Sequence, residues 1–252
     1  MKKKIVIANW KLNGNKNFVK EFIHNINSEN QKFFKNTKVI IAPPIIYIKY
    51  MSKKIHNKKI SFASQNVDYN YQGAFTGEIS PNMINEIGAK YIILGHSERR
   101  KNHFENNLLI AKKFFSVKKN KLIPILCIGE TQEEKEKNLT KNIIQKQIDE
   151  IFLHCGNNAF HNTFIAYEPI WSIGTGENAS PDDVNKIMKF IKNYIIKKSL
   201  YKKINLNLQY GGSVSPNNIK RIIEKKYIDG VLVGSGSLQY KNFLKIIQKC
   251  NV

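Results

Sequence analysis

Short runs of apolar residues recur along the whole chain, and stretches with helical spacing separate them. Eight such runs predict β-strands, at residues 5–8, 39–42, 61–65, 91–94, 122–127, 163–167, 206–210 and 230–233. Several runs are apolar at every position rather than at alternate positions, as expected of strands that are covered on both faces. The pattern therefore predicts a parallel sheet with helices packed against it.

The stretches between the runs carry apolar residues three or four positions apart, which is the spacing of one helix face. Two such faces are Phe18, Phe22, Ile23 and Ile26, and Leu108, Leu109, Ala111, Phe114 and Phe115. A helix start is predicted at Ser180, where the serine serves as cap and Pro181 takes the first position. Asp182 and Asp183 then place negative charge in the first turn, where the helix dipole favours it.

Strands and helical segments alternate over residues 1–252, and no linker or low-complexity stretch interrupts them. This order predicts a single α/β domain, either a closed barrel or an open doubly wound sheet. The count of eight strands and the length of 252 residues favour a (β/α)₈ barrel.

The composition excludes several other classes of protein. Hydrophobic residues make up 42% of the chain, and no run approaches the ~18 residues of a membrane span. The apolar run at 5–8 is shorter than the ~7 residues of a signal peptide core, so we expect a cytoplasmic protein. Three cysteines, an odd number without metal-type spacing, predict neither a disulfide framework nor a metal site.

The chain is strongly basic, with 41 Lys and Arg against 19 Asp and Glu and a net charge of +22. Such an excess is found in proteins that bind nucleic acids or anionic membranes, or that steer anionic substrates. Here the lysines are spread along the chain and arginine is scarce, whereas nucleic-acid readers more often gather arginine on one face. We therefore expect no nucleic-acid partner, and faster capture of phosphorylated metabolites as a side effect of the charge.

The most informative segment follows the sixth predicted strand. Glu168 ends an apolar run, and a short segment between Pro169 and Gly174 comes next. A fixed carboxylate beside a lid that excludes water is what proton abstraction from a carbon acid requires. The alternative is a strand end followed by an ordinary loop.

Other polar residues follow the first and fourth predicted strands, at the barrel end where active sites form. Asn9 and Lys11 follow the first strand and His96 follows the fourth. His96 precedes a helix opening at Ser97, where the dipole disfavours an imidazolium, so a neutral ring could donate an N–H to a carbonyl. Taken singly, His96 and Lys11 also fit a structural histidine and a solvated lysine. The remaining histidines are predicted to be surface or structural residues: His24, His56, His103, His154 and His161.

Two glycine-containing turns follow the seventh and eighth predicted strands. One contains Ser213 and the other contains Gly234 and Ser235. Such turns bring backbone N–H groups close to a phosphate, and barrel phosphate sites recur at these two strands. The glycines at 174–179 fit a dinucleotide pattern, but they do not open a helix directly on a strand. We therefore expect no nucleotide cofactor.

Seven motifs in one order identify a resemblance that covers nearly the whole chain. They lie at residues 8–13, 65–80, 94–100, 127–130, 167–171, 173–176 and 210–214. Together they resemble the triosephosphate isomerase family. The resemblance implies a TIM-barrel homodimer that interconverts D-glyceraldehyde 3-phosphate and dihydroxyacetone phosphate through an enediolate, in glycolysis and gluconeogenesis. It implies neither a cofactor nor a metal.

The resemblance also assigns roles to individual residues. It implies Glu168 as the base, His96 as the neutral electrophile with Asn9 assisting, and Lys11 as the cation that offsets substrate charge. The residues implied to hold the phosphate are Gly174, Ser213, Gly234 and Ser235. Thr76, in the loop at 73–78, is implied to reach the partner subunit.

The chain departs from the family pattern at three positions. Ser235 stands where glycine is expected, Ser172 replaces the usual alanine, and Glu177 stands where lysine or a neutral residue is more usual. A related alternative is another phosphosugar barrel, an aldolase or epimerase. An aldolase would need a buried lysine at a strand end, and the sixth strand ends in Glu168 instead.

Overall fold

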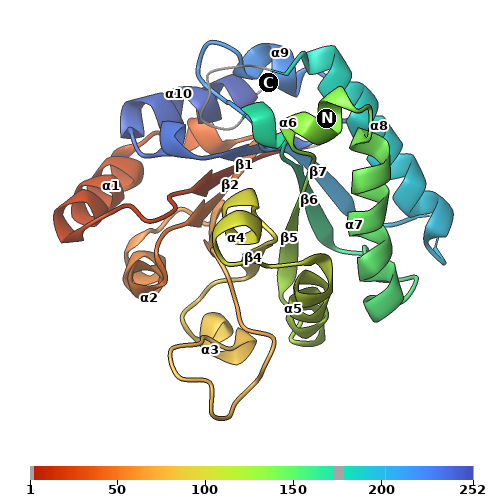
Figure 1. The fold of residues 1–252 in the computed structure, drawn as a ribbon. Helices are drawn as coiled ribbons and strands as arrows, with labels where there is room; N and C mark the ends of the chain where they lie inside the picture. Colours follow the sequence, from red (N-terminus) through yellow and green to blue (C-terminus); the bar gives the residue numbers. More distant parts are fainter. Residues whose placement is uncertain (1–2, 173–178, 202, 252) are drawn as a thin grey trace.

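A computed structural model describes residues 3–172, 179–201 and 203–251 of the chain. Eight parallel strands form a closed barrel in chain order, and β8 pairs with β1 to close it. Figure 1 shows the strands at the centre and the helices around them. The barrel prediction is confirmed, and the alternative of an open doubly wound sheet is excluded.

The strands are β1 (Lys4–Asn9), β2 (Thr37–Ala42), β3 (Ile60–Ser64), β4 (Tyr91–Leu94), β5 (Ile123–Ile128), β6 (Thr163–Tyr167), β7 (Leu206–Tyr210) and β8 (Gly230–Val233). Four strands, β4, β6, β7 and β8, have the bounds that the apolar runs predict. The bounds of β1, β2, β3 and β5 differ from the prediction by one or two residues. β1 and β2 are longer than predicted because Lys4–Asn9 pairs residue for residue with Thr37–Ala42, whether or not a position is apolar.

The α-helices are α1 (Lys16–Ser28), α2 (Ile45–Lys54), α3 (Pro81–Glu86), α4 (Ser97–Asn102), α5 (Asn107–Lys119), α6 (Gln132–Glu136), α7 (Thr140–Cys155), α8 (Pro181–Lys198), α9 (Ile219–Ile223) and α10 (Tyr240–Cys250). Three 3₁₀ turns are η1 (Gln31–Phe34), η2 (Ile170–Ser172) and η3 (Ser235–Ser237). Among the described helices, none is long and apolar enough to cross a membrane.

The predicted helix faces are partly correct. In α1, Phe22, Ile23 and Ile26 are buried as predicted, and Phe18 packs on the core as a half-buried residue. In α5 the predicted face is wrong at both ends, because Leu108 and Phe115 are 42% and 47% exposed. The apolar residues buried in α5 are Ile110, Ala111, Phe114 and Val117, so Ala111 and Phe114 are buried as predicted and Ile110 and Val117 complete the face. The predicted start of α8 is confirmed, with Ser180 at the cap position.

Both faces of the strands are buried, but in two separate cores. Residues such as Ile7, Ile40 and Cys127 fill the barrel interior, whereas their neighbours along each strand pack outward against the helices. The seam that closes the barrel requires a glycine at the start of β8. A Cβ on Gly230 would lie 1.9 Å from the carbonyl oxygen of Ile5, so a side chain there would force β1 and β8 apart.

A buried ion cluster joins α4, α5 and the loop after β3. The Glu105 carboxylate, on a residue only 3% exposed, accepts hydrogen bonds from Lys113 Nζ at 2.5 Å and Arg99 Nε at 2.7 Å. Lys113 Nζ also donates to Asn66 Oδ1 at 2.8 Å. Burial acts to raise the pKa of Glu105, but the hydrogen bonds and charges of Lys113 and Arg99 outweigh it and the pKa is lowered. The cluster therefore stabilises the fold in the ionised state of Glu105.

We expect the Glu105→Gln variant to unfold more easily at neutral pH, by about 3–5 kcal/mol, because it leaves Lys113 buried without its counter-ion. Since the folded-state pKa of Glu105 is lowered, its contribution is complete above the unfolded value of about 4 and is lost as the pH falls through the folded value. Urea unfolding across this range measures the difference. In the control Glu133→Gln, which breaks the exposed pair of Glu133 with Lys137, we expect a loss below about 1 kcal/mol. A pH-independent loss in Glu105→Gln would contradict the electrostatic account.

Candidate active site

Glu168 directly follows β6 and is 2% exposed. Its backbone N–H donates to the carbonyl oxygen of Ile128 at 2.8 Å, which continues the pairing of β6 with β5. Its own carbonyl lies against Gly129, where a Cβ would approach the oxygen to 1.9 Å. The backbone of Glu168 is therefore fixed from both sides, and its side chain leaves the strand from a defined position.

The carboxylate of Glu168 meets the loop after β4. Its Oε2 accepts a hydrogen bond from the Ser97 N–H at 3.2 Å, and its Oε1 lies 3.4 Å from Nε2 of His96. In the described part of the structure, Oε1 accepts no hydrogen bond. The structure thus brings together the carboxylate and the imidazole that the sequence places at the ends of two different strands.

His96 is the N-cap residue of α4. Its Nδ1 accepts a hydrogen bond from the backbone N–H of Glu98 at 3.3 Å, while the nearest carboxylate oxygen of Glu98 is 3.6 Å from Nδ1. A ring nitrogen that accepts a hydrogen bond carries no proton, so the proton of the neutral ring lies on Nε2. Nε2 is also the nitrogen next to Glu168, which leaves it as the donor at the site.

Lys11 follows β1 with φ of 53°, in the left-handed region that non-glycine residues rarely adopt. Asn9 Oδ1 accepts the Lys11 N–H at 3.1 Å, and Gln65 Nε2 donates to the Lys11 carbonyl at 2.9 Å. These bonds hold the strained turn. The Lys11 side chain passes beside Gly234, and its Nζ lies 2.5 Å from Oε1 of Glu98.

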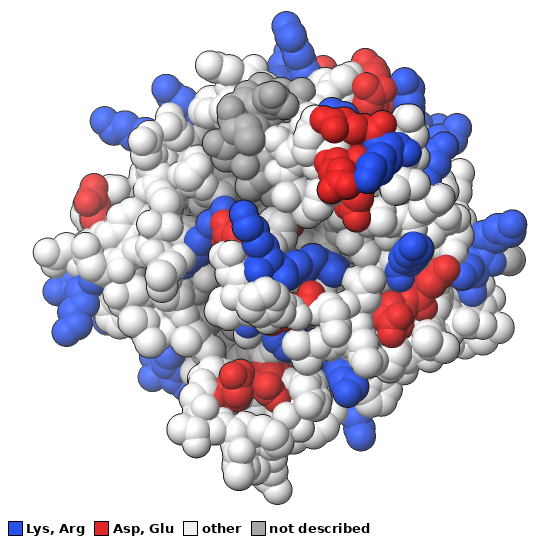
Figure 2. Space-filling view, viewed as in Figure 1, with Lys and Arg blue, Asp and Glu red and all other residues white. Residues whose placement is uncertain are grey.

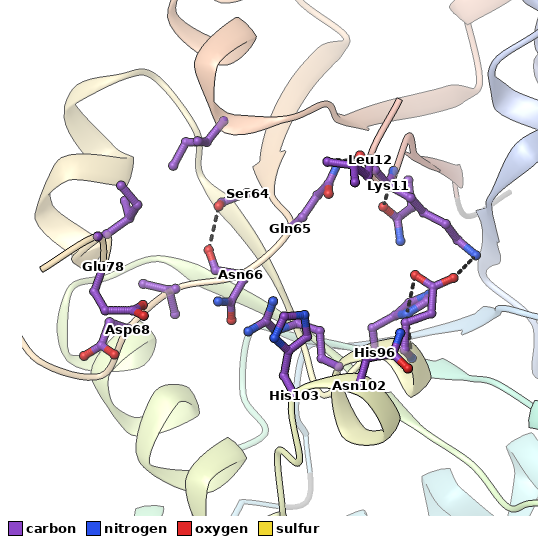
Figure 3. Close-up of a pocket in the computed structure, with 17 residues that line it drawn as sticks. Lys11, Leu12, Ser64, Gln65, Asn66, Asp68, Glu78, His96, Asn102 and His103 are labelled. Atoms are coloured by element: carbon purple, nitrogen blue, oxygen red, sulfur yellow. Dashed lines mark hydrogen bonds and ion pairs between the residues drawn. The ribbon is translucent and has the colours of Figure 1, made fainter. Parts of the chain in front are cut away.

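A cavity of about 690 Å³ opens at this end of the barrel (Figure 3). Its lining includes Asn9, Lys11 and His96, residues of the loop after β3, and residues of α4 such as Glu98 and Arg99. Glu168 does not line this cavity. Its carboxylate faces a narrow space beside Ser97 and Cys127. To act on a molecule in the cavity, the carboxylate must turn away from Ser97.

The residues predicted to hold a phosphate lie after two adjacent strands. Ser213 follows β7, and Gly234 and Ser235 follow β8. In the second turn, the Gly234 carbonyl accepts the N–H of Ser237 at 2.9 Å and its hydroxyl at 2.6 Å, which fixes the loop beside Lys11. Gly174 lies outside the described residues. The structure thus brings three of the four predicted phosphate residues to the same rim as Lys11.

Thr76 lies in a loop whose residues 71–78 are all exposed. Its neighbours Gly77 and Glu78 line the cavity of Figure 3. Ser172 is buried, and its hydroxyl donates to the Pro169 carbonyl at 2.9 Å, so this departure from the family pattern makes a bond that alanine could not. Glu177 lies outside the described residues. The five remaining histidines are exposed, in line with their prediction as surface or structural residues, and His103 lines the cavity.

Sequence reasoning missed a buried contact behind the site. Glu130 Oε1 accepts hydrogen bonds from the Tyr167 hydroxyl at 3.0 Å and from Trp171 Nε1 at 3.0 Å. Burial raises the pKa of Glu130, against the opposing effect of the bond from Trp171. The motifs at 127–130 and 167–171 are visible in the sequence, but no pattern within either one shows that they touch.

In the described part of the chain, no group of three or more His, Cys, Asp or Glu side chains is placed to hold a metal ion. The chemistry that the site offers comes from one carboxylate, one imidazole, one ammonium group and backbone N–H groups. On the face shown in Figure 2, lysine and arginine side chains are spread over the surface with acidic groups between them.

The closed barrel, with a carboxylate and an imidazole meeting where its strands end, defines an enzyme of the (β/α)₈-barrel class that works by acid–base chemistry. Residues 4–250 match the family model described as triosephosphate isomerase. The chain is 50% identical to the triosephosphate isomerase of Buchnera aphidicola subsp. Cinara cedri, over the full length of both. It is 52% identical to that of Buchnera aphidicola subsp. Schizaphis graminum over 98% of both chains, and 48% identical to that of Blochmanniella floridana over 98% and 95%. The chain belongs to the triosephosphate isomerase family.

Gly211 gives a direct test of how the carboxylate is held. A Cβ at this position would lie 2.8 Å from Cγ of Glu168, while the backbone there does not need glycine. We expect Gly211→Ala to lower kcat by about 10²-fold through displacement of the carboxylate, with little change in melting temperature. The control Asn217→Ala changes an exposed residue that follows the same strand, and it should leave kcat unchanged. A wild-type kcat in Gly211→Ala would contradict this account, because it would show that turnover does not depend on the position that Glu168 has in this structure.

Proposed function

We propose that Glu168, His96, Asn9 and Lys11 carry out the reaction of this family in this chain, the interconversion of D-glyceraldehyde 3-phosphate and dihydroxyacetone phosphate. The observation that supports it is the buried Glu168 carboxylate, whose Oε1 accepts no hydrogen bond in the described structure and lies 3.4 Å from His96 Nε2. A carboxylate oxygen with unengaged lone pairs can take a proton from carbon and return it to the neighbouring carbon.

A C–H bond next to a carbonyl is a weak acid, so its proton leaves only if the oxygen that gains charge is stabilised. The Nε2–H of His96 is the donor closest to Glu168 and can hydrogen-bond that oxygen without giving up its proton. Asn9 lines the same cavity and, because its Oδ1 is used by the Lys11 N–H, offers its amide hydrogens. Lys11 adds a positive charge that can offset the charge of the substrate. To do so, its ammonium group must leave Glu98 and pair with the substrate instead.

The phosphate of the substrate would bind at the turns after β7 and β8. Ser213, Gly234 and Ser235 offer backbone N–H groups there, and the Lys11 side chain passes beside Gly234. The role of Gly174 rests on the family resemblance alone. Binding at this remote group can supply free energy for the reacting end of the molecule and for excluding water from the enediolate. The net charge of +22 would speed the approach of an anionic substrate.

We also propose that the chain works as a homodimer, with Thr76 at the contact. Large apolar side chains are exposed around the cavity and the loop, including Leu12 at 96%, Phe75 at 46% and Phe104 at 84%. The loop at 73–78 is exposed throughout, and the cavity of about 690 Å³ extends beyond His96 along residues 64–68. In the proposed dimer, the same loop from a second copy would enter the part of the cavity that a three-carbon substrate leaves open.

A coupled assay for triose phosphate interconversion in the presence of a chelator tests the reaction and its independence from metal. We expect Glu168→Asp, which draws the carboxylate back by about 1 Å, to cost on the order of 10² in kcat. We expect His96→Gln to lower kcat with little change in substrate affinity, since the imidazole acts on the developing charge. If His96→Gln changes affinity alone, or if Glu168→Asp turns over normally, the assigned roles are wrong.

The dimer is tested by sedimentation of the Phe75→Asp variant. A charge in the exposed loop should shift the equilibrium toward monomer and lower activity together with it, because an apolar contact is replaced by a charge. Leu153→Asp provides the matched control, since Leu153 is 78% exposed on α7 and lies outside the proposed contact. A monomeric wild-type protein, or equal dissociation in both variants, would refute the proposed contact.

A further inference from the structure

A second cavity, of about 960 Å³, lies among α6, α7 and α8. These helices lie next to one another at the barrel's edge (Figure 1). Its apolar wall consists of Trp171, Ala179, Val184, Ile187 and Phe190, and its lysines are Lys135, Lys141, Lys186 and Lys189. Among the described residues that line it, none belongs to the set to which we assign catalysis or phosphate binding.

The cavity combines aromatic surfaces with ammonium groups. Lys135 Nζ lies 3.3 Å from the centre of the Trp171 ring, and Lys141 Nζ lies 5.7 Å from that of Phe190. The Trp171 ring is fixed by its hydrogen bond to buried Glu130. Aromatic rings of this kind stack on planar ligands, and lysines beside them bind anions.

The charges lining the cavity favour an anion. Four lysines face two acidic residues, Glu130 and Asp183. Asp183 pairs with Lys186 at 2.8 Å, and Glu130 is buried behind Trp171. Lys141 and Lys189 therefore remain as an excess of positive charge beside the apolar wall, while Lys135 lies on the Trp171 ring and its charge acts on Glu130.

We propose that this cavity binds a nucleoside phosphate, with its base against Phe190 and on the Trp171 ring in the place of the Lys135 ammonium group. The phosphates then lie near Lys141, Lys189 and the displaced Lys135. A ligand that has only a planar ring or only an anionic group would match either the apolar wall or the lysines, but not both. A sugar phosphate lacks the planar ring that the aromatic wall accommodates, and a neutral aromatic molecule leaves the lysines without a counter-charge. The nucleoside phosphate matches both.

Occupancy of the cavity should reach the active site through a short segment. Trp171 lies three residues after Glu168, and Ile170 between them donates its N–H to the Glu130 carbonyl at 3.0 Å. A ligand packed on Trp171 restrains the segment that carries the carboxylate, so it should lower kcat without competing with substrate. This consequence rests on the proposed function, whereas binding of the nucleoside phosphate does not.

Tryptophan fluorescence provides the test, because the chain has two tryptophans and Trp10 is fully buried in the core. Titration with ADP should change the Trp171 emission saturably, and adenosine or inorganic phosphate alone should bind at least tenfold more weakly. The double variant Lys141→Gln, Lys189→Gln should weaken ADP binding roughly tenfold, as expected for the loss of charge-assisted contacts. The control Lys146→Gln removes an exposed lysine of α7 that does not line the cavity and should leave the affinity unchanged.

Saturating dihydroxyacetone phosphate separates the two cavities. Undiminished ADP binding in its presence supports a separate site, and displacement of ADP by the triose phosphate places the nucleotide in the first cavity and overturns the proposal. Equal affinity in the double variant and the control also overturns it. A protein that binds ADP in this way but lacks isomerase activity would refute the proposed function and leave the nucleotide site standing.

Discussion

The hydrogen bond from the Ser97 N–H to the Glu168 carboxylate joins two loops that are 71 residues apart in the chain. It forms only because β4, β5 and β6 are parallel neighbours whose carboxyl ends meet at one rim. The contact of the Glu168 carbonyl with Gly129 fixes the depth at which the side chain emerges. The position of His96, the N-cap residue of α4, follows from the same loop. Each part of the site therefore depends on the register of the barrel.

Much of this arrangement can be predicted from the sequence, because strand ends are marked by a change from apolar to polar residues. Four strands, β4 and β6 to β8, have the predicted bounds, and each is followed directly by a polar residue or a glycine. β1 runs on through the polar Asn9, because Asn9 pairs with Ala42 of β2. Since parallel strands end at a common rim, Asn9, His96 and Glu168 could be expected to gather there. Lys11 follows from the same argument.

Contacts between side chains from different loops could not be predicted. The pairing of Lys11 with Glu98 and that of Glu130 with Trp171 depend on tertiary distances that no local pattern encodes. The predicted face of α5 is wrong at Leu108 and Phe115, which are apolar yet exposed, so hydrophobicity alone does not show which side of the helix faces the barrel. The turned-away resting position of the Glu168 carboxylate is likewise visible only in three dimensions.

The three cysteines occupy layers of different depth. Cys127 faces the barrel interior beneath Glu168, Cys250 lies in the outer core, and Cys155 is half-buried. Burial raises the pKa of Cys155 and of Cys250 to about 12, and that of Cys127 is raised well above its usual range by burial and then by the Glu168 charge. Because the thiolate is the reactive form, an alkylating reagent modifies each cysteine only after local unfolding exposes its thiol to solvent. The order in which the thiols are modified would therefore record whether the helical shell loosens before the strands separate.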